Sequence, residues 1–229
     1  MEIKKTGGEA YALVYVILNH GESIIAENGA MVAMSAGIEI TVAAEGGIGK
    51  SIGRKIFADE GFFFTRFTAH AGGAWVALAP KFPGDIFTTL ATSEGLTIQT
   101  GSMLGHGEDV ETKIIYAGVK SALMKEGLTA IQANGEGYIL LSTYGAVEEI
   151  NLVQGQELNI DSGHLVAWTP SLKLDLILAG GLINQAFSGE GIVAKFTAVE
   201  NDGKIIIQTR SEKQLFQWLT PERNENSGG

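Results

Sequence analysis

A short glycine-centred motif occurs three times in the 229-residue chain, and it limits the possible folds more than any other feature. The three copies are Glu27–Ala33, Gln99–Gly105 and Asp161–Ala167. Their central glycines, Gly29, Gly101 and Gly163, define two intervals along the sequence. Repetition of this kind indicates several structural units of one type along one chain.

The same two intervals relate other features of the sequence. Short segments in which apolar residues alternate with other types follow each copy, at Ile38–Ile40, Val110–Thr112 and Leu172–Leu174. Alternation with a period of two is typical of strands. We therefore predict an all-β chain that forms one compact unit over 1–220, with three tandem β units at about 21–82, 83–153 and 154–210. The 31 glycines would then lie mainly at repeated corners.

Helices are expected to be few. The best candidate is a C-terminal helix at 211–220, where Ser211 and Gln214 resemble a capping box and Pro221 follows the last turn. Two shorter helices and a disordered polar tail are expected at 50–58, 119–126 and 221–229.

The chain carries little charge for a globular protein. Charged residues make up 18% of it, against about 25% in ordinary domains, and the mean hydropathy is +0.16. We expect part of the surface to be covered by further copies of the chain. The net charge of −10 argues against nucleic-acid binding, because that binding relies on clustered Lys and Arg. The absence of cysteine excludes disulfides and thiolate metal sites.

The segment Gly46–Ser51 ends like a phosphate-binding P-loop. In that motif the first glycine would fall at position 44, which is Ala44 in this chain. Because backbone N–H groups must converge on the phosphate, we interpret the segment as a structural turn.

No metal or other cofactor is expected from the histidines. There are four, His20, His70, His106 and His164, and no two of them form a His-x-His pair. His164 lies inside the third copy of the glycine motif, which favours a role in a turn or an interface.

The pair Glu148-Glu149 is the sharpest acidic feature. Adjacent strand residues point to opposite faces of a sheet, so this pair does not predict a catalytic carboxylate dyad. One of the two glutamates could meet Arg66 or Lys195 across a subunit or repeat boundary, but a solvated or salt-bridged edge is the simpler interpretation. We expect no catalytic residues and predict that the chain is not an enzyme.

Six strings of the sequence, in this order, resemble the signatures of one family. They are Gly29-Ala30-Met31-Val32, Phe67-Thr68-Ala69, Leu78-Ala79-Pro80-x-x-Pro83-Gly84-Asp85-Ile86, Tyr144-Gly145-Ala146-Val147-Glu148-Glu149-Ile150, Gly163-His164-Leu165-Val166-Ala167-Trp168 and Phe187-Ser188-Gly189-Glu190-Gly191. The family is the AIM24-like group of uncharacterised proteins, prokaryotic relatives of the altered-inheritance-of-mitochondria protein.

The resemblance implies a double-stranded β-helix or β-sandwich built of three units similar to the trp RNA-binding attenuation protein. It also implies a homotrimer, and it transfers no catalytic residues. Mitochondrial relatives are associated with the organisation of the inner membrane. Because this sequence begins almost directly at the expected fold, with no targeting segment recognised, we expect a cytoplasmic protein of a prokaryote.

The leading hypothesis is therefore a non-enzymatic oligomeric β scaffold that holds a protein partner or contacts a membrane surface peripherally. The alternative is an RNA- or small-ligand-binding module with clefts between the β units, in which Arg66, Gln132 and Lys195 would be the candidate contacts. The candidate interaction or structural residues are Gly29, Gly84, Asp85, Gly101, Gly145, Glu148, Glu149, Gly163, His164 and Gly191.

Overall fold

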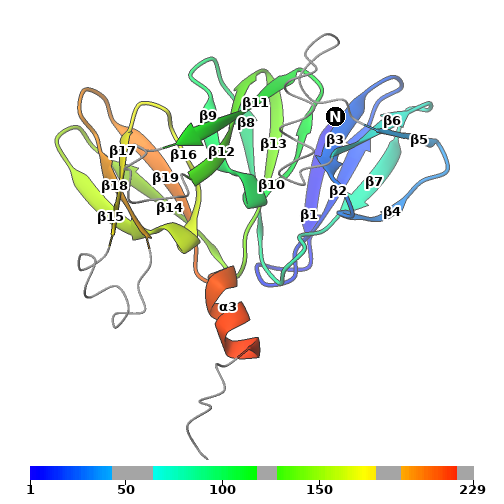
Figure 1. Ribbon diagram of the computed structural model, residues 1–229. Helices are drawn as coiled ribbons and strands as arrows, with labels where there is room; N and C mark the ends of the chain where they lie inside the picture. Colours follow the sequence, from blue (N-terminus) through cyan, green and yellow to red (C-terminus); the bar gives the residue numbers. More distant parts are fainter. Residues whose placement is uncertain (43–63, 118–127, 179–191, 221–229) are drawn as a thin grey trace, which may run out of the picture.

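The computed structural model of the chain describes residues 1–42, 64–117, 128–178 and 192–220. Within these ranges it contains 19 strands, one α-helix and two short 3-10 turns, so the all-β prediction is confirmed (Figure 1). The helices expected at 50–58 and 119–126, and the tail at 221–229, lie outside the described residues.

The strands follow one another in three groups, after an N-terminal strand β1 (Glu2–Thr6). The first group consists of β2 (Leu13–Leu18), β3 (Ser23–Glu27), β4 (Met31–Met34), β5 (Ile38–Val42), β6 (Phe64–Ala69) and β7 (Ala74–Leu78). The middle group consists of β8 (Ile86–Ala91), β9 (Leu96–Gln99), β10 (Met103–Gly107), β11 (Val110–Ala117), β12 (Leu128–Gly135) and β13 (Gly137–Ser142). The last group consists of β14 (Val147–Leu152), β15 (Glu157–Asp161), β16 (Leu165–Trp168), β17 (Lys173–Leu178), β18 (Ile192–Thr197) and β19 (Gly203–Gln208).

The same antiparallel pairing occurs in all three groups. The last strand of each group lies between the first and the third, giving the orders β2-β7-β4, β8-β13-β10 and β14-β19-β16. The fifth strand lies between the second and the fourth, giving β3-β6-β5, β9-β12-β11 and β15-β18-β17. By its pairing, β14 belongs with the last group, although the expected boundary at 153 would place it in the middle one.

Two strand pairs join neighbouring groups into continuous sheets. β3 pairs with β10, and β9 pairs with β16, so each six-stranded sheet takes three strands from one group and three from the next. The three groups consequently lie side by side in Figure 1, in chain order.

A register shift also recurs at one place in each group. It falls between Met31 and Ala33 in β4, between Met103 and Gly105 in β10, and between Leu165 and Ala167 in β16. These positions are related by the same two intervals that separate the glycine motifs in the sequence. A bulge bends its strand, so the three shifts give the three groups a common curvature.

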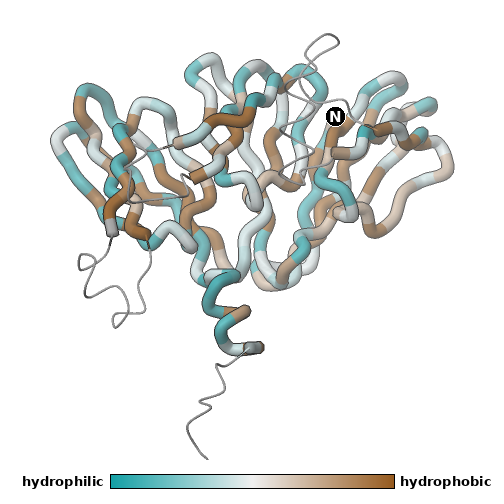
Figure 2. The backbone as a smooth tube through the Cα atoms, viewed as in Figure 1, coloured by the Kyte–Doolittle hydropathy of each residue, from teal (hydrophilic) through white to brown (hydrophobic). Residues whose placement is uncertain are grey.

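Alternating side chains create the core. In β2, for example, Val14, Val16 and Leu18 are buried, and the residues between them are half exposed. Three apolar clusters result, centred on successive groups, and the brown interior segments in Figure 2 follow them. The first cluster also takes Ile86, Leu104 and Leu140 from the middle group, so neighbouring groups share a core.

The C-terminal helix α3 (Glu212–Leu219) confirms the helix expected at 211–220, and it projects away from the sheets (Figure 1). The expected capping box is wrong, because the side chain of Ser211 makes no capping hydrogen bond. Ser211 is buried instead, against Gly163. The apolar side of α3 lies largely in solvent, with Trp218 77% exposed.

Candidate functional site

A cavity of about 310 Å³ lies where the three groups meet the start of α3. Residues from each group line it: Glu27 from the end of β3, Ser102 from the 3-10 turn η1 (Thr100–Ser102), and Gln208 from the end of β19. Glu212 of α3 also lines it. The cavity is therefore formed by the folding of the whole chain, since no single group supplies its walls.

Aromatic side chains form part of the wall. The rings of Phe82 and Tyr144 lie 5.4 Å apart between centroids and are tilted by 37°. The ammonium of Lys81 lies 5.4 Å from the centroid of Phe82, within the range of a cation–π interaction. Phe64, at the start of β6, also lines the cavity.

Glu27 is the charged residue of the cavity whose ionisation the fold perturbs. Burial raises the pKa of its carboxyl above the ordinary value, and the nearby carboxylate of Glu212 acts in the same direction. Lys81 opposes both effects on this pKa without cancelling them. Within the described residues, the Glu27 carboxyl has no hydrogen-bond or ion-pair partner.

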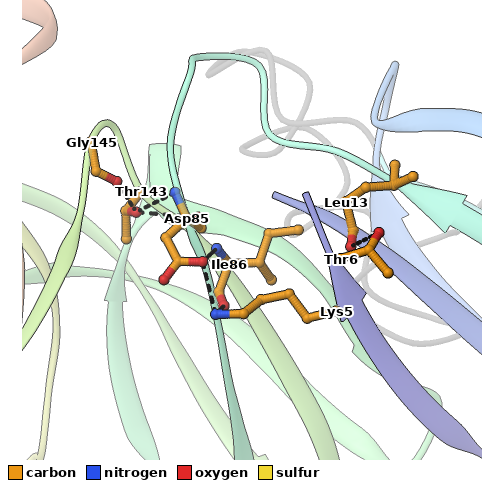
Figure 3. A network of polar contacts seen from close by, with 7 residues as sticks. All are labelled: Lys5, Thr6, Leu13, Asp85, Ile86, Thr143 and Gly145. Carbon is orange, nitrogen blue, oxygen red and sulfur yellow. Dashed lines mark hydrogen bonds and ion pairs between the residues drawn. The ribbon is translucent and has the colours of Figure 1, made fainter. Parts of the chain in front are cut away.

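A dense polar network lies beside the cavity and contains several of the residues singled out in the sequence (Figure 3). Backbone bonds join two loops: Asp85 N donates to Gly145 O and Gly145 N donates to Pro83 O, both at 3.0 Å. The hydroxyl of Thr143 lies 3.0 Å from Gly145 O and accepts a 3.2 Å bond from Asp85 N. The network thus ties the start of β8 to the loop between β13 and β14.

The carboxylate of Asp85 is the buried charge of this network. Its Oδ1 accepts a 2.7 Å hydrogen bond from Ile86 N and lies 2.9 Å from the Nζ of Lys5. Asp85 is 3% exposed and the Lys5 side chain is partly exposed, so the strand β1 that carries Lys5 is fixed to the middle group by a partly buried contact.

The glycines that were singled out in the sequence differ in why glycine is needed at their positions. A Cβ on Gly84 would collide with the backbone carbonyl of Thr143, and Gly145 has a φ of +80° and faces Thr209 Oγ1. Gly29 has a φ of +86° beside open space. Gly101 has open space and no such φ, so only its place in the repeat made it conspicuous.

Gly163 and His164 belong to the 3-10 turn η2 (Ser162–His164) beside the cavity. The Nδ1 of His164 lies 2.8 Å from the backbone oxygen of Gln208. The Gln208 side chain accepts a 2.8 Å bond from Tyr144 N and donates a 3.1 Å bond to Gly163 O. His164 therefore helps to hold the end of β19, in keeping with the turn role expected for it.

Glu148 and Glu149 lie on β14 and do not line the cavity. Glu149 pairs with Lys204 at 3.0 Å, and Glu148 is exposed. Within one chain, Arg66 pairs with Glu108 and Lys195 with Glu157, each at 3.0 Å.

Several candidate positions fall outside the described residues, namely Gly191 and the P-loop-like segment 46–51. The segment 49–53, which fits a Gly-x-Ser-x-Gly pattern, also falls there. Among the described residues, no group of three or more His, Asp or Glu side chains is placed to hold a metal ion. None of the helices within the described ranges is long and apolar enough to cross a membrane.

Sequence reasoning missed Glu27 as a cavity residue, although a signal was present. Glu27, Gln99 and Asp161 occupy the same place in the three motif copies. Asp161 uses its carboxylate to accept a 2.9 Å hydrogen bond from Gly163 N, which is the ordinary capping role of a residue before such a turn. Within the described part of the chain the Glu27 carboxylate makes no such bond, and Glu27 lines the cavity.

Comparison with known proteins gives two relatives of nearly full length. The uncharacterised protein M6_Spy0233 of Streptococcus pyogenes serotype M6 is 28% identical over 213 residues, which cover 90% of this chain and 84% of the relative. The crystal structure of protein SPYM3_0169 from Streptococcus pyogenes superposes with a TM-score of 0.78 at 26% identity, covering 96% of this chain and 98% of that one. The sequence profile described as "Mitochondrial biogenesis AIM24" matches residues 3–210, and the chain therefore belongs to the AIM24 family.

Proposed function

We propose that the chain is a non-enzymatic structural protein whose copies join head to tail through β4 and β15 into a closed homo-oligomeric scaffold. Three copies would give a ring of nine strand groups. The strongest support is that the chain contains the same type of junction between groups twice. The two strand edges that would form a third junction, one in the first group and one in the last, have no partner strand among the described residues.

The two internal junctions have the same construction. The second strand of one group pairs with the third strand of the next, as in β3 with β10 and β9 with β16. Among the described residues, β15, the second strand of the last group, pairs only with β18. The third strand of the first group, β4, likewise pairs only with β7. A third junction of the same type between two copies would pair both free edges, and unlike edges of this kind join head to tail.

The register of this third junction follows from the first two. Ala26 pairs with Gly105, and the equivalent pair one group later is Ile98 with Ala167. Ile25 pairs with His106, and its equivalent is Thr97 with Trp168. The same intervals bring Ile160 opposite Ala33 of a second copy, and Asn159 opposite Met34 of that copy.

Burial supports the same junction. Every residue of β10 and of β16 is buried, and every residue of β4 is exposed, with Val32 at 60%. These strands are equivalent by pairing, and they differ in that β10 and β16 are covered by the preceding group. An exposed apolar edge strand is a hazard for aggregation, and a matching edge on another copy removes it.

Disulfide trapping tests the junction, and the chain contains no cysteine that would interfere. A Met34→Cys, Asn159→Cys double variant should form intermolecular disulfides under mild oxidation, because directly opposed strand residues have a suitable separation. The matched control combines Met34→Cys with Glu157→Cys, which is two positions out of register and should cross-link far less. Light scattering should give three times the chain mass of 24.2 kDa. A monomer by light scattering, or equal trapping of both pairs, would overturn the proposal.

The scaffold could present α3 to its partner. Phe216 and Trp218 are exposed on this projecting helix, which supports contact of the assembly with another protein or with a membrane surface. The RNA alternative receives less support, since Arg66 and Lys195 are both engaged by carboxylates and the net charge is −10.

A further inference from the structure

We propose that the cavity at the junction of the three groups binds a small organic amine in its ammonium form. This site is separate from the β4 and β15 edges, and the proposal goes beyond the scaffold role.

The cavity has the size of a small-ligand site. Its volume of about 310 Å³ lies at the lower end of the usual range, which is roughly 300 to 1,000 Å³. Aromatic side chains provide apolar wall, and polar side chains from three separate parts of the chain converge on it. Polar groups that converge on a cavity orient a small ligand within it.

Ser102 brings a hydroxyl to the wall of the cavity. The residue is 5% exposed, and its hydroxyl makes no hydrogen bond within the described residues. A ligand N–H in the cavity would donate a hydrogen bond to this hydroxyl.

The charged side chains that line the cavity favour a positively charged ligand. Glu27 and Glu212 outnumber Lys81 among its charged side chains, and neither carboxylate has an ion-pair partner within the described part of the chain. The Glu27 carboxylate is partly desolvated and forms no ion pair with Lys81, so an ammonium beside it would gain a charge-assisted hydrogen bond. The ammonium of Lys81 already lies over Phe82, which indicates that this wall accommodates positive charge.

The aromatic side chains in the wall favour an apolar group in the part of the ligand away from its ammonium. Phe64, Phe82 and Tyr144 offer ring surface on which a flat or aliphatic body can pack. The geometry thus suits a molecule with one ammonium end and one apolar end.

Isothermal titration calorimetry with phenethylamine at pH 7.5 tests the proposal. Phenethyl alcohol is the matched neutral probe, and 3-phenylpropionate is the matched anion. The amine should bind at least about tenfold more tightly than the alcohol, because only the amine pairs with Glu27. The anion should not bind. Equal affinities for amine and alcohol, or tighter binding of the anion, would contradict the ammonium assignment.

Variants then locate the site. Glu27→Gln should weaken amine binding at least about tenfold, and Ser102→Ala should weaken it about two- to fivefold. Lys81→Met should tighten it, because a competing cation is removed; weaker binding in this variant would contradict the charge argument. Glu148→Gln, an exposed change on β14, is the control and should leave the affinity unchanged. Thermal unfolding checks that each variant is folded.

The outcome is independent of the scaffold proposal. Amine binding that is unaffected by Glu27→Gln overturns the site and leaves the β4–β15 junction standing. Failure of the disulfide trapping leaves the site standing.

Discussion

The Nζ of Lys5 lies 2.9 Å from Oδ1 of Asp85, and this contact joins residues 80 positions apart in the sequence (Figure 3). The same oxygen accepts the hydrogen bond from Ile86 N that begins β8. One buried carboxylate therefore fixes both β1 and the entry to the middle group.

Replacing Asp85 should destabilise the protein. Asp85→Ala leaves the buried Ile86 N–H without its side-chain acceptor and Lys5 without its partner, which should lower the free energy of unfolding by about 1–3 kcal/mol. Lys4→Ala is the control, because Lys4 is well exposed and its one ion pair within the described residues is with Glu2, and it should change stability by less than about 0.5 kcal/mol. Urea unfolding at one fixed protein concentration measures both, since assembly would otherwise shift the midpoint. Equal effects of the two substitutions would remove the special role of Asp85.

The conspicuous glycines should differ in their tolerance of alanine. Gly84→Ala should cost about 2 kcal/mol or more, because the new Cβ meets a backbone carbonyl that cannot move aside. Gly29→Ala should cost about 1–2 kcal/mol for its positive φ alone. Gly101→Ala should lie within about 0.5 kcal/mol of the parent. Thermal and urea unfolding of the three variants would check this order, and a Gly101→Ala variant as unstable as Gly84→Ala would contradict it.

The raised pKa of Glu27 makes a prediction about stability and pH. A carboxyl with a raised pKa in the folded state contributes its full stability below its unfolded pKa of about 4.3, and that stability is lost as the pH rises through the folded pKa. Glu27→Gln keeps a neutral side chain at every pH. It should therefore raise the melting temperature at pH 7 and have little effect at pH 4.

Differential scanning calorimetry at the two pH values measures this effect. Glu148→Gln again serves as the control, because an exposed glutamate on β14 should give no pH-dependent difference. A Glu27→Gln variant that is less stable than the parent at pH 7 would show that the carboxylate stabilises the fold. The Glu27 carboxylate would then already have a favourable partner in the folded protein, and this would argue against its role as the ammonium-binding group.

The sequence determined the repetitive part of this protein. The two intervals between the three glycine motifs also relate the three register shifts and the two junctions between groups. Such features are local, because strand alternation and turn residues act on neighbours in the chain. The all-β class and the C-terminal helix could be predicted for the same reason.

Only the tertiary structure decided the roles of the residues that meet across groups. Gly84 and Gly145 form one bridge although the whole middle group lies between them in the sequence, and Glu27, Ser102 and Glu212 share one cavity. Glu27 and Asp161 occupy equivalent positions in the repeat. The Asp161 carboxylate accepts a hydrogen bond from Gly163 N, whereas the Glu27 carboxylate is partly desolvated at the cavity. The burial of a side chain and its partners depend on residues that pack against it from other groups. A repeat in the sequence shows only which positions are equivalent.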